Sequence, residues 1–147
     1  FIGGIVGSVR YSNILNSYVL GDISGMSFIG GIAGYVDNGS TVQYNAAINS
    51  AISGTNNVNR IVGNINDNRI IYTVSNNFAL DTMSVTGARS GDEGANKTID
   101  ELKIKTTYSN STTNGGLGWK FGDDDDNPWK MEEGKNNDLP YFYWQDL

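Results

Sequence analysis

The sequence predicts an all-β protein, a right-handed parallel β-helix (solenoid) of about three coils followed by a C-terminal cap. A short apolar and glycine-rich motif recurs at a spacing that suits one solenoid coil. Apolar and polar residues alternate around each copy, as they do in half-buried strands. Glycine accounts for 19 of the 147 residues and proline for 2, a composition that fits many short strands joined by tight turns.

The repeated motif begins at residue 1, returns at residue 28 and appears in degenerate form at residue 59. Its central glycines lie 27 and 29 residues apart (34 − 7 and 63 − 34) and are Gly7, Gly34 and Gly63. The alternation predicts that the isoleucine two positions before each glycine points inward. We therefore expect Ile5, Ile32 and Ile61 to stack in one ladder, with strands about 4.8 Å apart. A central glycine lets the walls of a narrow core approach each other.

The second half of each copy covers residues 14–25, 42–54 and 75–87 and ends in an apolar residue, Ser or Thr, and then Gly. Asparagine occurs near the strand corners, at Asn16, Asn45 and Asn77. Buried amides at equivalent positions of stacked coils can form a hydrogen-bonded ladder. The sequence therefore predicts an asparagine ladder at these positions rather than a ligand site.

These residues resemble a known repeat. Gly-Gly-Ile-Val-Gly followed by Ile-x-Asn-x-Tyr-x-x-Gly-x-Ile-Ser-Gly is similar to the GLUG motif of bacterial cell-surface proteins, among them adhesin-like proteins and some immunoglobulin A peptidases. Residues 1–25 match it best, 28–54 well and 59–87 loosely. The resemblance implies β-helical repeats outside the cell. In the peptidases the chemistry lies in a separate domain, whose metal-binding motif does not occur in this chain.

Residues 1–87 are thus expected to form the repeats and residues 88–147 the cap. Within the cap, residues 88–96 read as a polar surface loop. Thr98 and Glu101 have the spacing of a capping box, which predicts a short helix over about residues 98–106. Small aromatic strands follow between residues 119 and 144, and a similar tail often follows GLUG repeats. Trp119 and Trp129 alternate with lysines, so we expect both indoles to be buried.

Two groups in this region raise the question of ligands. Four consecutive carboxylates, Asp123, Asp124, Asp125 and Asp126, are weak candidates for calcium, which prefers oxygen ligands. Their spacing does not match an EF-hand loop, and a solvated hairpin loop is the favoured interpretation, without a bound metal. The aromatic cluster could offer a stacking surface for sugar rings, and Tyr143 and Trp144 are the candidate contacts.

Composition excludes several functions. The chain has no cysteine or histidine and a net charge of −6, which argues against thiol or His-based catalysis, against the usual zinc sites and against nucleic-acid binding. Acidic residues that could serve a polysaccharide-cleaving β-helix sit mainly beside turn residues and are Asp22, Asp37, Asp67 and Asp81. No cofactor is expected.

The resemblance, together with this composition, therefore implies a non-enzymatic, secreted or cell-surface repeat module of bacterial origin, a fragment of an adhesin or stalk that contacts a host or neighbouring-cell protein or glycan. The alternative is a carbohydrate-binding or polysaccharide-cleaving β-helix. The chain starts at Phe1 inside a repeat, which suggests a fragment whose first coil associates end to end with another chain. Its apolar runs are shorter than the roughly 20 residues of a membrane span.

Overall fold

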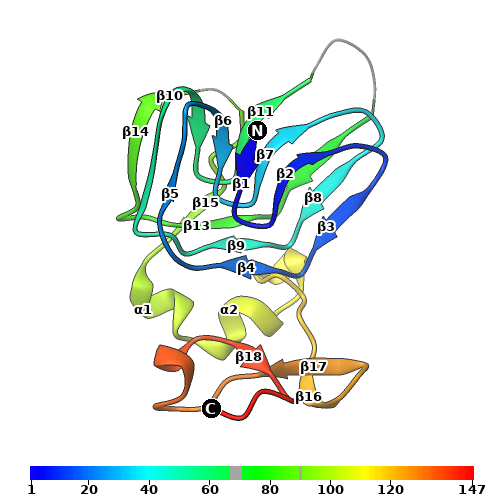
Figure 1. Ribbon diagram of the computed structural model, residues 1–147. Helices are drawn as coiled ribbons and strands as arrows, with labels where there is room; N and C mark the ends of the chain where they lie inside the picture. Colours follow the sequence, from blue (N-terminus) through cyan, green and yellow to red (C-terminus); the bar gives the residue numbers. More distant parts are fainter. Residues whose placement is uncertain (67–70, 90) are drawn as a thin grey trace. The chain divides into compact units, whose positions relative to one another are not determined.

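The computed structural model describes residues 1–66, 71–89 and 91–147. Strands dominate it and its helices are short, so the all-β class is confirmed. The chain divides into two compact units, Phe1–Lys97 and Thr98–Leu147, which we call the N-terminal and C-terminal units and describe separately (Figure 1). Among the described residues, no helix is long and apolar enough to cross a membrane.

The described strands of the N-terminal unit form four sheets, and every pairing within them is parallel. The first contains β1 (Ile2–Gly3), β5 (Ile23–Ser24), β6 (Ser27–Gly30), β10 (Ala51–Asn59) and β14 (Ser84–Ala88). The second contains β2 (Val6–Val9), β7 (Ala33–Val36) and β11 (Val62–Ile65). The third contains β3 (Asn13–Leu15), β8 (Thr41–Gln43) and β12 (Thr73–Ser75). The fourth contains β4 (Tyr18–Val19), β9 (Ala46–Ala47), β13 (Phe78–Leu80) and β15 (Ala95–Lys97).

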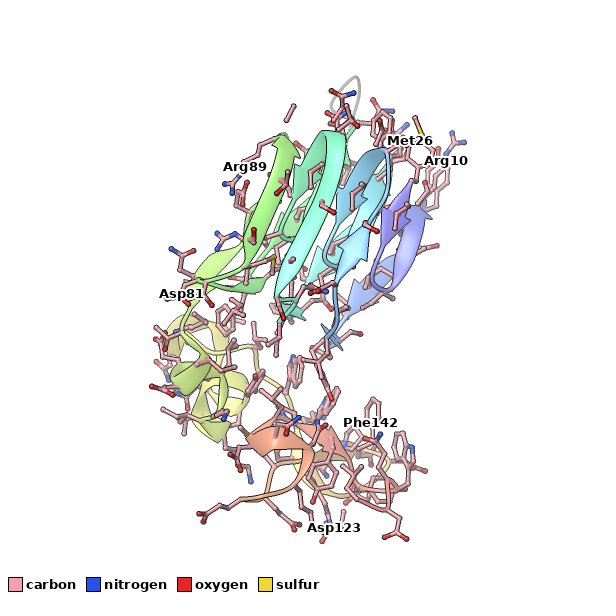
Figure 2. All side chains as sticks on the ribbon, turned by 60° about the vertical axis from the view of Figure 1, so that its left-hand side comes forward. Arg10, Met26, Asp81, Arg89, Asp123 and Phe142 are labelled. Atoms are coloured by element: carbon pink, nitrogen blue, oxygen red, sulfur yellow. The ribbon has the colours of Figure 1, made fainter. Side chains whose placement is uncertain are left out.

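The pairing divides most of the N-terminal unit into three stacked layers, residues 1–27, residues 28–56 and residues 57–66 with 71–88. Each strand of one layer pairs with the equivalent strand of the next, as in Val6 with Ala33 and Ala33 with Val62. Figure 1 shows the layers as nested turns of chain coloured blue, cyan and green, and Figure 2 shows their strands side by side. Each sheet of this unit therefore consists of strands from successive layers.

The predicted isoleucine positions are aligned across the layers. The amide of Ile5 donates to the carbonyl of Ile32 at 3.0 Å, and the amide of Ile32 donates to that of Ile61 at 2.9 Å. Ile32 and Ile61 are completely buried, whereas Ile5 is 41% exposed. Ile5 lies in layer 1, which pairs with a neighbouring layer on one side, so its side chain is less covered than that of Ile32.

Gly34 illustrates why glycine occupies the centre of the motif. A Cβ atom at Gly34 would lie 2.5 Å from the amide nitrogen of Ile2 and from the carbonyl oxygen of Phe28. Both atoms are backbone and cannot rotate away, so any larger side chain would push β1 and β6 outward. Gly63 meets Ile29 and Gly34 in the same way. The glycines thus allow two walls of each layer to touch.

The asparagine ladder contains Asn45 and Asn77 but not Asn16. The amide nitrogen of the Asn45 side chain donates to Oδ1 of Asn77 at 3.1 Å, and Oδ1 of Asn45 accepts the backbone N–H of Ser17 at 3.1 Å. Ser17 therefore holds the ladder position in layer 1, and the prediction for Asn16 was one residue out. Asn16 has a φ of 50° and is exposed, because it forms the left-handed corner before the ladder.

Layer 3 is covered by the segment that follows it. The carbonyl of Asp92 accepts the backbone N–H groups of Ile61 and Val62, each at 3.2 Å, and β15 pairs parallel with β13. The N-terminal unit extends to Lys97, whereas the sequence predicts that the cap starts at residue 88. The prediction of a plain surface loop over residues 88–96 missed this because the segment is polar and its strand is short.

Arg60 holds residues 93–96 of this segment by hydrogen bonds. Its guanidinium donates to Glu93 at 3.0 Å, to Asn96 at 2.7 Å and to the carbonyl of Gly94 at 3.3 Å. In the preceding layer the equivalent residue is Gly31, where a Cβ would lie 2.1 Å from the Arg60 carbonyl oxygen. Arg60 has the polar segment above it instead of another strand layer, so a long side chain fits. The position held by Gly4 and Gly31 in the first two copies can therefore be occupied by Arg60 in the third.

The C-terminal unit starts with two short helices, α1 (Ile99–Leu102) and α2 (Lys105–Ser109), rather than the single helix predicted over residues 98–106. The predicted capping box is present, with Thr98 and Glu101 each accepting from the backbone of the other. A 3-10 turn, η1 (Thr112–Asn114), leads to an antiparallel sheet of β16 (Phe121–Asp124), β17 (Asn127–Lys130) and β18 (Tyr141–Phe142), with the turn η2 (Asn136–Asp138) before its last strand.

We predict that Ile32→Ala lowers the free energy of unfolding by about 2–5 kcal/mol, since it leaves a cavity between two layers. Ile5→Ala removes the same atoms from the exposed end of the same stack and should cost clearly less. Urea unfolding followed by circular dichroism measures both. Equal losses for the two variants would contradict the burial difference between the layers.

Arg60→Ala should destabilise the closing segment by about 1–3 kcal/mol, because charged hydrogen bonds are lost from a side chain that is only 13% exposed. Amide hydrogen exchange should then accelerate at Ile61 and Val62, whose N–H groups bond to Asp92. Arg89→Ala is the matched control, since Arg89 pairs with the same Glu93 but is 56% exposed. Unchanged exchange in Arg60→Ala would show that the segment holds without the arginine.

Candidate functional site

Asp22 and Asp37, two of the acidic residues considered for polysaccharide cleavage, accept hydrogen bonds from different donors. Oδ1 of Asp22 accepts the backbone N–H of Ala51 at 2.9 Å, so it fixes the start of β10. Asp81 is an exposed turn residue directly after β13, and Asp67 lies outside the described residues. Asp37 is bound in a polar stack of its own. The described carboxylates thus have separate structural contacts at the ends of strands.

Asp37 links the three layers on the outside of the second sheet. Its carboxylate accepts from the Asn38 backbone at 2.8 Å and from the side-chain amide of Asn66 at 2.9 Å, and Arg10 lies 3.5 Å away. Arg10, Asp37 and Asn66 directly follow the paired strands β2, β7 and β11. The Asn38 and Asn66 hydrogen bonds, followed by the Arg10 charge, hold the pKa of Asp37 below its ordinary value.

The acidic run of the C-terminal unit forms a hairpin between β16 and β17. Asp123 pairs with Lys130 at 2.7 Å, Asp124 accepts from Asn127, and Asp125 accepts from the Tyr143 hydroxyl at 2.7 Å. The carboxylates therefore point to different partners, and all four aspartates are exposed. In the part of the chain that the structure describes, no three acidic side chains gather in a way that could hold a metal ion.

Aromatic rings form a continuous column in the C-terminal unit. Its successive centroids lie 4.3–4.9 Å apart, and the rings belong to Tyr108, Trp119, Trp129, Phe142 and Trp144. Tyr108, Trp119 and Trp129 are buried, and the Tyr108 hydroxyl donates to the carbonyl of Leu102 at 2.7 Å. The sequence reasoning singled out the tryptophans but missed Tyr108 and Phe142, because stacking between distant residues leaves no local pattern.

The column ends at the surface with Trp144, which is 59% exposed. One face of its indole stacks on Phe142 at 4.4 Å with an interplanar angle of 7°. Tyr143 packs against the same indole at 83°, and its hydroxyl holds Asp125. This hydrogen bond raises the pKa of the Tyr143 phenol, since the carboxylate accepts its proton. The two residues predicted as ligand contacts therefore lie together, beside an acidic hairpin.

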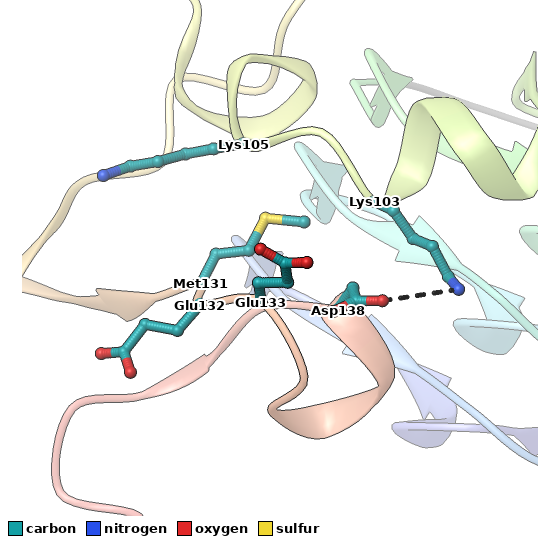
Figure 3. A pocket seen from close by; sticks show the side chains of 6 residues that line it. All are labelled: Lys103, Lys105, Met131, Glu132, Glu133 and Asp138. Carbon is teal, nitrogen blue, oxygen red and sulfur yellow. Dashed lines mark ion pairs between the residues drawn. The ribbon is translucent and has the colours of Figure 1, made fainter.

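Two shallow hollows in the C-terminal unit were not signalled by the sequence. The first, of about 270 Å³, is lined by Lys103, Lys105, Met131, Glu132, Glu133 and Asp138 (Figure 3). The second, of about 320 Å³, shares Lys105, Met131 and Glu132 with it. Lys103 and Asp138 are 3.8 Å apart, and Lys105 lies over the Phe121 ring at 5.0 Å. Both hollows are small and charged, at the lower end of the size of ligand pockets.

The Asp37 cluster yields a prediction for pH. Because the folded pKa of Asp37 is lowered from 3.8, its charge stabilises the fold above that pH and the contribution is lost as pH falls through the folded pKa. Asn66→Ala should raise this pKa more than Arg10→Ala, since the hydrogen bond is the stronger influence. Carbon-detected NMR titration of the Asp37 carboxyl measures both shifts, and the reverse order would contradict the assignment.

No protein-family model matches the chain, and neither a curated protein nor a solved structure matches it. The resemblance of residues 1–25, 28–54 and 59–87 to the GLUG motif therefore stays a prediction from the sequence.

Proposed function

We propose that the chain is a module of a bacterial cell-surface protein of the GLUG-repeat type, in which a right-handed parallel β-helix acts as a rigid stalk or adhesion surface. The observation that carries the proposal is the register of the N-terminal unit. Ile2 pairs with Ile29 and Ile29 with Val58, so each layer repeats the position of the one before. Parallel strands joined through a crossover are almost always right-handed.

The stacking supports a mechanical role. Every layer is held by backbone hydrogen bonds to the next, and the side chains buried between the layers are mainly apolar. Ile52 lies between Ile23 and Val85 and is completely buried. Such repeats build length without new chemistry, which suits spacing and display. The sequence has no cysteine, so the layers are held without disulfide bonds.

Several carboxylates are engaged in separate structural contacts, which favours a binding role over a catalytic one. Asp22 and Asp37 hold strand ends, and the Asp123–Lys130 and Asp125–Tyr143 pairs fix the hairpin. A glycosidase needs two carboxylates a few ångströms apart across the scissile bond. The separate contacts of Asp22 and Asp37 favour the contact role over the alternative of a polysaccharide-cleaving β-helix.

Microspheres coated with the full chain should adhere to cultured cell layers or to extracellular material better than those coated with the misfolded variant Ile32→Asp. The variant places a charge in the apolar core, so it removes the fold and keeps the rest of the composition. Retention under flow is the measurement. Equal retention of both coatings would refute the adhesion surface.

The same preparations test the enzymatic alternative. Incubation with plant, bacterial and host polysaccharides should release no new reducing ends. If the natural chain releases reducing ends and the Asp37→Asn variant does not, the chain is a polysaccharide-cleaving enzyme and the proposed role is wrong.

A further inference from the structure

We infer that the exposed end of the aromatic column binds a neutral sugar ring, with Trp144 as the stacking surface and the Asp125 hairpin beside it. This inference rests on the proposed contact function and names its ligand class. The site comprises Trp144, Tyr143, Gln145 and Asp125, which we call the Trp144 surface. All four lie in the C-terminal unit.

The Trp144 ring is exposed and at the same time held in place. Phe142 stacks under it, Trp129 stacks under Phe142 at 4.3 Å, and buried Trp119 follows at 4.4 Å. A side chain that is already fixed loses little conformational freedom when a ligand binds. An isolated surface tryptophan would instead rotate freely, so the buried part of the column prepares the exposed part.

The backbone around Trp144 is fixed as well. The amide of Phe142 donates to Oε1 of Gln145 at 2.7 Å, and the amide of Gln145 donates back to the Phe142 carbonyl at 2.9 Å. The amide of Tyr143 donates to the carbonyl of Pro128 at 2.9 Å. These bonds close a tight turn in which the Gln145 side chain presents its N–H₂ group at the surface.

The polar groups beside the ring suit hydroxyls. Asp125 accepts from Tyr143 through Oδ1, and a carboxylate can accept further hydrogen bonds from hydroxyl donors. The Tyr143 oxygen and the Gln145 amide can also bond to hydroxyl groups. A pyranose offers the matching partner, because its ring carries a face of C–H groups for the indole and a rim of hydroxyls for the polar groups.

Charge selects among sugars. Asp123 is neutralised by Lys130, but the neighbouring aspartates leave the hairpin acidic, and the chain as a whole carries −6. Uronic and sialic acids would be repelled by these carboxylates. A purely apolar peptide would stack on the indole but offer no donor to the acceptor sites of Asp125 that Tyr143 does not use. The chemistry therefore favours an uncharged pyranose.

The test titrates the full chain with cellotriose, maltotriose and triacetylchitotriose, and with trigalacturonic acid as the charged comparison. The Trp144 indole N–H of the natural chain is followed by NMR, and the affinities of the natural chain and the variants are measured by isothermal titration calorimetry. At least one neutral trisaccharide should shift this signal, while trigalacturonic acid should not. Trp144→Ala should weaken binding at least about tenfold, and Trp144→Phe should recover part of it, since a smaller aromatic face remains.

Tyr11→Ala is the matched control, because Tyr11 is an exposed aromatic residue of the N-terminal unit, at 69% against 59% for Trp144, and its loss should leave binding unchanged. Circular dichroism checks that Trp144→Ala is folded. The inference is overturned if no neutral trisaccharide shifts the Trp144 signal, if Trp144→Ala binds as well as the natural chain, or if the acidic sugar binds equally. If the coated microspheres still adhere in any of these cases, the proposed adhesion function is retained and only the sugar site is refuted. If they do not adhere, both the sugar site and the proposed function are refuted.

Discussion

The structure of the N-terminal unit depends on one constraint, the in-register parallel pairing of each layer with the next. Within a layer the strands are two to five residues long apart from β10, too short to be stable alone. Pairing such as Ile14 with Val42 and Val42 with Val74 satisfies the backbone and places apolar side chains on one another. Loss of register by one residue would turn every such side chain outward.

This constraint explains which residues vary between the copies. Positions between two layers hold small or apolar residues, such as Gly34 and Ile32, or polar residues that bond to both neighbouring layers, such as Asn45. The copy that starts at residue 59 lies under a polar segment rather than under another layer of the same kind. Arg60 replaces glycine there and binds Glu93, so the weakest match to the repeat is also the place where the stack is closed.

Much of the N-terminal unit could be predicted because stacking leaves a period in the sequence. The spacing of the glycines aligned Ile5, Ile32 and Ile61 in the same order as the backbone hydrogen bonds do. The asparagine ladder was misplaced at Asn16, because a corner residue and the residue after it look alike when both are polar. The pairing of residues 95–97 with β13 could not be predicted from the sequence, since three residues of mixed polarity show no alternation of apolar and polar side chains.

The candidate site could be predicted only in part. The capping box at Thr98 and the presence of Tyr143 and Trp144 in one segment are local features. The column that joins Trp144 to Tyr108 is formed by rings from four separate segments, and its order follows from packing that no spacing encodes. The hydrogen bond from Tyr143 to Asp125 likewise depends on how β16, β17 and β18 pair.

Hydrogen exchange at three equivalent amides tests the layered pairing most directly. Ile5, Ile32 and Ile61 each donate to the carbonyl of the next layer or of the closing segment, but only Ile32 lies between two strand layers. The account predicts the slowest exchange at Ile32, an intermediate rate at Ile61 under the Asp92 segment and the fastest at Ile5. Equal rates at the three amides, or fast exchange at Ile32, would contradict the stacked parallel layers.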